Sequence, residues 1–182
     1  MSARRTAAAM LMLAALGGCA DSAPPAAPAS PPDVVKPADP SRDGARAGQW
    51  ARAESERDKR PIAWQYREDF AVAPPRQLPQ LLVVSQGLKI PYVGQVDPAL
   101  QQGFAVREQR LLDALKDKAE LVAVLDWSQQ HDWFFYADAS VTRESVTLAL
   151  GDVGGHDVRV TLENDAQQQF YGTLKQRVSG SP

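Results

Sequence analysis

Residues 20–46 carry seven prolines between Pro24 and Pro40 and almost no bulky apolar side chain. Such a segment cannot bury enough apolar surface to offset the entropy cost of ordering it. We therefore expect a solvated tether over residues 19–60, partly in polyproline conformation, with a possible short charged helix over 47–59. Folding is then left to residues 61–182, roughly 120 residues, which is enough for one modest core.

Five segments of this C-terminal part are typical of strands, because they alternate apolar and polar side chains or run apolar for several residues. They are residues 62–69, 80–86, 120–127, 133–137 and 158–162. Apolar side chains at helical spacing predict helices over 106–119 and 165–176. Asp165 is a favoured N-cap, and Gln168 follows it at capping-box spacing.

Residues 140–150 fit either a strand or a helix. Val146, Leu148 and Leu150 alternate as in a strand, whereas Val146, Ala149 and Leu150 also share one helical face. With the helical option, the order of elements predicts an α/β domain of two layers. We expect a mainly antiparallel sheet with helices on one face.

The N-terminus has the organisation of a secretory signal peptide. Arg4 and Arg5 precede an apolar run over residues 7–16, which is too short to cross a bilayer, since a spanning helix takes roughly 20 residues. We expect residues 1–18 to be removed. The rest of the chain has 18 basic and 22 acidic residues and no block of five like charges, so a nucleic-acid partner is not expected.

The only cysteine, Cys19, follows Leu16, Gly17 and Gly18, and this tetrapeptide resembles the lipobox of bacterial lipoproteins. The resemblance implies that Cys19 becomes the acylated first residue of the mature chain. Two or more acyl chains hold a protein stably at a membrane. Since Ala20 is not the aspartate that retains enteric lipoproteins, the resemblance implies the periplasmic face of the outer membrane.

Two alternatives remain open for this end of the chain. Asp21 leaves retention in the inner membrane possible, and the Ala-rich flanks also suit an ordinary signal peptidase. If Cys19 carries lipid, the chain has no thiol left for a disulfide or a thiolate metal site.

Residues 61–176 resemble the bacterial domain family catalogued as domain of unknown function 695. The resemblance lies in an aromatic strand that ends in Tyr136 and Asp138, and in a closing helix that opens with Asp165 and carries Tyr171. The chain departs from the family at Gln168, where the family has tryptophan, and in the turn over 128–132, which lacks glycine. The resemblance implies a ferredoxin-like α/β fold and no established activity.

A group of polar side chains near one predicted turn offers weak candidates for a metal site: Asp126, His131, Asp132 and Asp138. We favour a solvated turn, because strand alternation places Asp126 and Asp132 on the solvent face and aspartate is common in turns. We therefore expect no metal and no cofactor.

Aromatic side chains provide a possible binding surface: Trp64, Tyr66, Tyr92, Trp133 and Tyr136. Packing in the core is the stronger expectation for the four of them that lie on predicted strands, because strands favour aromatic residues and helices must cover the sheet. The glycine-bounded segment 87–98 is interpreted as a connection, with a recognition loop as the alternative.

The sequence contains no nucleophile-elbow motif and no phosphate-binding glycine loop. We therefore expect a membrane-anchored, non-enzymatic domain that binds a protein or another envelope component. The alternative is an envelope hydrolase that acts through carboxylates such as Glu120, Asp126 or Asp138.

Overall fold

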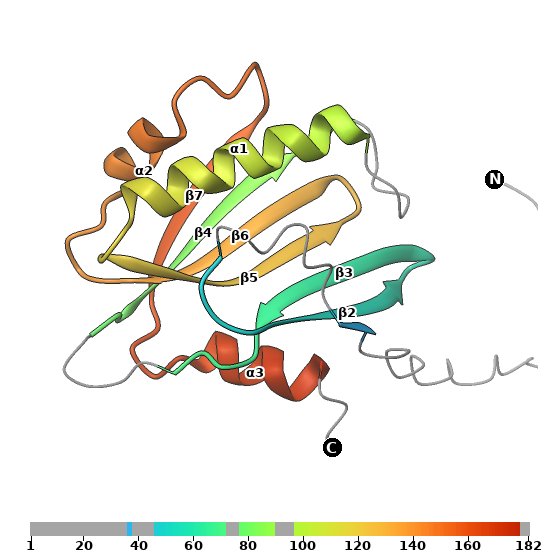
Figure 1. The fold of residues 1–182 in the computed structure, drawn as a ribbon, viewed down its shortest axis with the longest axis horizontal. Coiled ribbons are helices and arrows are strands. Elements are labelled where there is room, and N and C mark those ends of the chain that lie inside the picture. The colour runs from blue at the N-terminus through green and yellow to red at the C-terminus, as the bar shows by residue number, and fades with distance from the viewer. Residues whose placement is uncertain (1–35, 38–45, 72–76, 90–96, 179–182) are drawn as a thin grey trace, which may run out of the picture.

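The computed structural model describes residues 36–37, 46–71, 77–89 and 97–178 (Figure 1). Over these residues the chain forms an α/β domain with one antiparallel sheet and three helices. The strands are β1 (Lys36–Pro37), β2 (Trp50–Arg57), β3 (Arg60–Arg67), β4 (Gln80–Gly87), β5 (Ala119–Trp127), β6 (Gln130–Ala137) and β7 (Val158–Asn164). The helices are α1 (Pro98–Ala114), α2 (Arg143–Leu150) and α3 (Gln169–Val178). Cys19 and Tyr92 lie outside the described residues.

The strands lie in the order β1-β2-β3-β5-β6-β4-β7, and all described neighbours are antiparallel. Along the sequence the second part of the chain runs β4-α1-β5-β6-α2-β7. In the sheet, β6 lies between β5 and β4, and β4 lies between β6 and β7. The hairpin of β2 and β3 extends this sheet beside β5. Its two-residue turn, Asp58 and Lys59, has φ of 54° and 59°, as a type I′ hairpin turn requires.

Residues 47–59 do not form the short helix that we expected, because β2 occupies most of this segment and pairs along its whole length with β3. Ala51 and Ala53 point inward against the sheet face that carries Tyr66, while Arg52 between them points the other way. Small alanines between charged residues give a weak strand pattern in the sequence. Residues 46–60, which we had assigned to the predicted tether, therefore belong to the folded part of the chain.

A buried ion pair joins the start of this hairpin to α1. The guanidinium of Arg46 donates two hydrogen bonds of 2.6 Å to the carboxylate of Glu108 and one of 2.7 Å to Gln65. Trp133 Nε1 donates to the same carboxylate at 3.0 Å. Because both charges are almost fully enclosed, this network fixes β2 and β3 relative to α1 and β6.

The helices lie on both faces of the sheet, not on one (Figure 1). Trp133 and Phe135 of β6 pack with α1 and α2, whereas Phe134 and Tyr136, which alternate with them, pack with α3. The expectation of a single helical layer is wrong because β6 is apolar on both faces, and both faces need cover.

The ambiguous segment 140–150 is helical over α2. Thr142 is its N-cap, and Thr142 and Ser145 form a reciprocal capping box. Val146 and Leu150 point into the core, while Leu148 is 83% exposed. The helix ends at Gly151, whose φ of 63° favours glycine.

Candidate binding surface

Hydrogen bonds to Asp165 hold α3 against the sheet. Its carboxylate accepts from the backbone N–H of Gln169 at 2.8 Å and of Phe170 at 3.0 Å, at the start of the helix. It also accepts from the hydroxyl of Tyr136 at 2.6 Å. Burial alone would raise the pKa of Asp165, but these hydrogen bonds lower it, and burial together with the bond to Asp165 raises the pKa of Tyr136.

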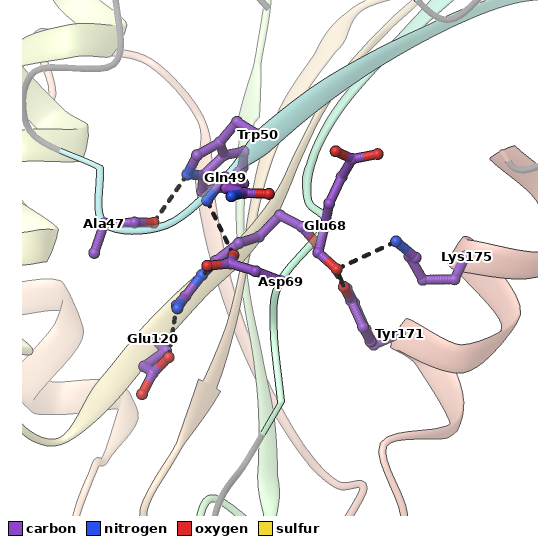
Figure 2. A network of polar contacts seen from close by, with 9 residues as sticks. Ala47, Gln49, Trp50, Glu68, Asp69, Glu120, Tyr171 and Lys175 are labelled. Atoms are coloured by element: carbon purple, nitrogen blue, oxygen red, sulfur yellow. Dashed lines mark hydrogen bonds and ion pairs between the residues drawn. The ribbon is translucent and has the colours of Figure 1, made fainter.

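A second set of contacts, drawn in Figure 2, ties α3 to the end of β3. The hydroxyl of Tyr171 donates to the carbonyl of Arg67, and Lys175 Nζ donates to the carbonyl of Glu68 at 3.3 Å. The Arg67 guanidinium in turn pairs with Asp69 at 3.0 Å and Glu120 at 2.6 Å. These contacts place α3 over one end of its sheet face.

Beyond α3, the same sheet face carries a row of partly exposed apolar side chains. The side chains on this face come from strand positions that alternate with Trp133, which points to the opposite face. The strand register places these side chains next to one another on neighbouring strands. We call this face the α3-side surface. Its apolar members are Ile62, Trp64, Val83, Leu125 and Trp127 of the strands, together with Phe170 of α3.

A groove with a volume of about 330 Å³ lies between Trp64 and α3. Trp64 and Phe170 line the groove, and both rings pack on the buried Phe134, with ring centroids 5.6 Å and 4.6 Å from it. Thr173 and the exposed Arg177 line the groove on the helix side. Arg177 makes no ion pair with any other residue that the structure describes.

A polar cavity of about 150 Å³ lies on the same face toward β7. Ser85, Gln130 and Arg159 line it, together with Gln129 and Asp157. Asp132 lies beside Ser85 in the strand register and is buried, with Gln130 donating to its carboxylate at 2.9 Å. Burial raises the pKa of Asp132, although hydrogen bonds from Ser85 and Gln130 oppose this effect. The α3-side surface thus combines an apolar groove with a polar cavity.

Three of the four residues proposed as weak metal ligands, Asp126, His131 and Asp132, are not in a solvated turn. The turn between β5 and β6 is only Ser128 and Gln129, so His131 and Asp132 belong to β6, and Asp126, His131 and Asp132 are all buried. The predicted five-residue turn is wrong for this reason. Asp126 and His131 share the face that α1 covers, whereas Asp132 lies on the opposite face.

Asp126 and His131 form a buried pair, with His131 Nδ1 2.5 Å from Asp126 Oδ1. The imidazole stacks on Phe104 at 3.9 Å, and Gln86 lies directly across from it on β4. His131 Nε2 and both polar atoms of the Gln86 amide have no hydrogen-bond partner in the described part of the chain. No group of three or more possible metal ligands occurs in that part.

Four of the five aromatic residues proposed for binding are described. Tyr66, Trp133 and Tyr136 are buried in the core, so they do not form an exposed surface. Trp64 lies at the groove, and Tyr92 falls outside the described residues. Core packing, the stronger expectation, is confirmed for the three buried rings.

Sequence reasoning did not identify Phe170, Arg177 and Arg159 as surface candidates. Phe170 fits the apolar face of the predicted helix over 165–176, which favours packing against the sheet, and Arg177 lies one residue beyond the predicted end of that helix. Arg159 alternates with Val158 and Val160, a pattern that does indicate an outward side chain.

The carboxylates of the hydrolase alternative have separate partners. Glu120 pairs with Arg67, Asp126 pairs with His131, and Asp138 accepts hydrogen bonds from Ser140. Because each carboxylate is held in a different local arrangement, this geometry gives no support to a catalytic pair formed from them.

The chain was compared with family models, curated proteins and solved structures, and no similar protein was found. The resemblance of residues 61–176 to the domain of unknown function 695 family stays a prediction. Among the described helices, none is both long and apolar enough to span a membrane.

Proposed function

We propose that this protein is a lipoprotein anchored at the periplasmic face of the outer membrane, and that its folded domain is a non-enzymatic binding module. The signal-like N-terminus, the lipobox-like residues 16–19 and the proline-rich segment after Cys19 support the anchor. Inner-membrane retention is the alternative location.

We further propose that the unit from β4 to β7 is ferredoxin-like, as the family resemblance implies. The element order β-α-β-β-α-β and the strand order β5-β6-β4-β7 support this assignment. The β2–β3 hairpin and α3 are then additions to that unit. The addition of α3 creates the groove beside Trp64, so the candidate surface belongs to this chain's own elaboration of the fold.

The groove between Trp64 and α3 is the observation that carries the binding proposal. Trp64 and Phe170 are partly exposed beside a buried aromatic core, and tryptophan in a concave site is a favoured anchor point for a partner. We take the partner to be a protein segment with an apolar side chain next to a carboxylate. The apolar side chain fits the rings of Trp64 and Phe170. The carboxylate fits Arg177, whose guanidinium makes no ion pair within the part of the chain that the structure describes.

Site-specific crosslinking in intact cells tests this proposal. A photo-crosslinking amino acid replaces Thr173, which is exposed and lines the groove, and in a control it replaces Thr147, which is exposed on α2. We expect a specific adduct from position 173 only. The adduct should fall at least about tenfold in Arg177→Glu, a loss of about 1.4 kcal/mol or more in binding, and persist in Arg177→Lys.

The exposure of Arg177 makes this variant informative, because surface substitutions usually change stability by less than about 0.5 kcal/mol. Thermal unfolding of Arg177→Glu should therefore match that of the unmodified chain. An adduct that forms equally from positions 147 and 173, or that is insensitive to charge reversal at Arg177, would falsify binding at the groove.

A further inference from the structure

β7 is an edge strand with one side open to pairing. Among the described strands its only neighbour is β4, which it meets along all seven of its residues. The carbonyl of Asp157 accepts from Gly87, and the N–H of Asp165 donates to Pro79, so odd-numbered residues of this segment bond toward β4. The backbone groups of the even-numbered residues, Val158 to Asn164, therefore point to the open side.

The side chains of β7 are complementary to a second copy of the same strand. In an antiparallel pair centred on Thr161, Val160 faces Leu162, and Arg159 faces Glu163 twice, once on each side of the axis. Arg159 and Glu163 are exposed and make no ion pair with another described residue. The same register joins the even-numbered residues through their free backbone groups. Within the strand its charge match is the Arg159–Glu163 pair, and just beyond the strand ends it brings Asp157 opposite Asp165.

Neighbouring two-fold registers lack this match. Centred on Val160, the pairing brings Arg159 opposite Thr161 and Glu163 opposite Asp157, so the arginine has no acidic partner. Centred on Leu162, it sets Arg159 opposite Asp165, whose carboxylate already accepts from Tyr136 and from the start of α3.

We propose that β7 pairs with β7 of a second copy of this chain about a two-fold axis at Thr161, forming one sheet that runs through both subunits. Val160 and Leu162, which already pack at the margin of the core beneath α1 and α2, then cover each other across the interface. This interface is separate from the groove beside Trp64, which lies at β3 on the other side of the sheet's centre. It does not depend on the proposed function.

Disulfide trapping tests the register directly. In the full chain with Cys19→Ser, the substitution Thr161→Cys introduces the only thiol. Residues at the axis form a non-hydrogen-bonded pair with Cα atoms about 4.5 Å apart, within the range of about 4.4–6.8 Å that a disulfide spans. We expect mild oxidation to give a covalent dimer on a non-reducing gel.

Thr173→Cys in the same background is the matched control. It is also an exposed threonine, but it lies beside β3, four strands from β7 and therefore about 19 Å from the axis or more. We expect it to remain monomeric on the gel.

Charge reversal provides a second measurement that needs no new thiol. Light scattering of the Cys19→Ser chain should give the mass of a dimer. Arg159→Glu should weaken the dimer at least about tenfold, and adding Glu163→Arg should restore it, because both pairs then exist in reversed form. The proposal is overturned if Thr161→Cys gives no more crosslinked dimer than Thr173→Cys, or if light scattering gives the mass of a monomer. It is also overturned if Thr161→Cys is trapped by a different protein in place of a second copy.

Discussion

At the residue scale, the contact between Tyr136 and Asp165 shows how a single polar pair joins two layers of the fold. Tyr136 is buried in the middle of β6, and its hydroxyl reaches the carboxylate that begins α3. Because this bond lowers the pKa of Asp165, its contribution to stability is present above the unfolded pKa of about 3.9 and is lost as pH falls through the folded pKa.

We expect Tyr136→Phe to lower the free energy of unfolding by about 1.5–3 kcal/mol at pH 7, since the lost hydrogen bond involves a charged acceptor. The loss should shrink below pH 4 as Asp165 becomes protonated. Urea unfolding at pH 7 and pH 3 measures both effects. Tyr66→Phe is the control, because its hydroxyl makes no hydrogen bond to another described residue, and it should cost less than about 0.5 kcal/mol. Equal losses at the two pH values would contradict the role given to Asp165.

Residue types alone predicted part of this site. Asp165 was recognised as a cap from its position before an apolar helical pattern, and its carboxylate does accept from the first N–H groups of α3. Gln168 does not complete a capping box, because its φ of 55° places it outside the helix. The bond to Tyr136 joins residues 29 positions apart, and no local pattern contains that information.

At the element scale, the positions of the strands were predicted better than the turn between β5 and β6 and the burial of the side chains beside it. All five expected strands exist, because their apolar runs are long enough to mark them, and β6 begins three residues earlier than expected. That shift follows from the two-residue turn after Trp127. It moved His131 from an exposed turn to a buried pair, and it placed Asp132 on the opposite face, where Gln130 donates to its buried carboxylate.

Helix α1 contains a signal that could have been recognised. Asp97 accepts from the N–H of Ala99, and Pro98 occupies the first turn, which is a common way to begin a helix. The expected helix began at 106 because the segment before it has few apolar residues at helical spacing. Its expected end at 119 was late, since Asp117 has φ of 66° and Ala119 already belongs to β5.

The link between α1 and the hairpin gives a prediction at this scale. We expect Glu108→Ala to destabilise the domain by about 3–5 kcal/mol, because Arg46 then remains buried without its counter-ion. The double change Arg46→Met and Glu108→Leu should cost less than Glu108→Ala, since it removes both buried charges together. Thermal and urea unfolding of the two variants measure the difference. A double variant less stable than Glu108→Ala would show that the charges themselves stabilise the fold.

At the scale of the whole molecule, the proposed anchor and the folded domain lead to separate predictions. We expect Cys19→Ser to move the protein from the membrane fraction to the soluble fraction and to abolish labelling by a palmitate analogue. The melting temperature of the domain should stay unchanged. Fractionation and gel fluorescence measure these effects, and a serine variant that still takes up label would rule out Cys19 as the acylated residue.

The entry of the chain into the sheet has a mechanical consequence. The N-terminal segment joins the fold at β1 and β2, along the edge opposite β7. Once the two-residue β1 has separated from β2, a force applied to the N-terminal segment acts on Arg46 first. It acts on the hydrogen bonds between β2 and β3 only after that. Because Arg46 is hydrogen-bonded to the buried Glu108, the force is transmitted to α1 in the centre of the molecule. The ladder between β2 and β3 is then not loaded one hydrogen bond at a time from its end.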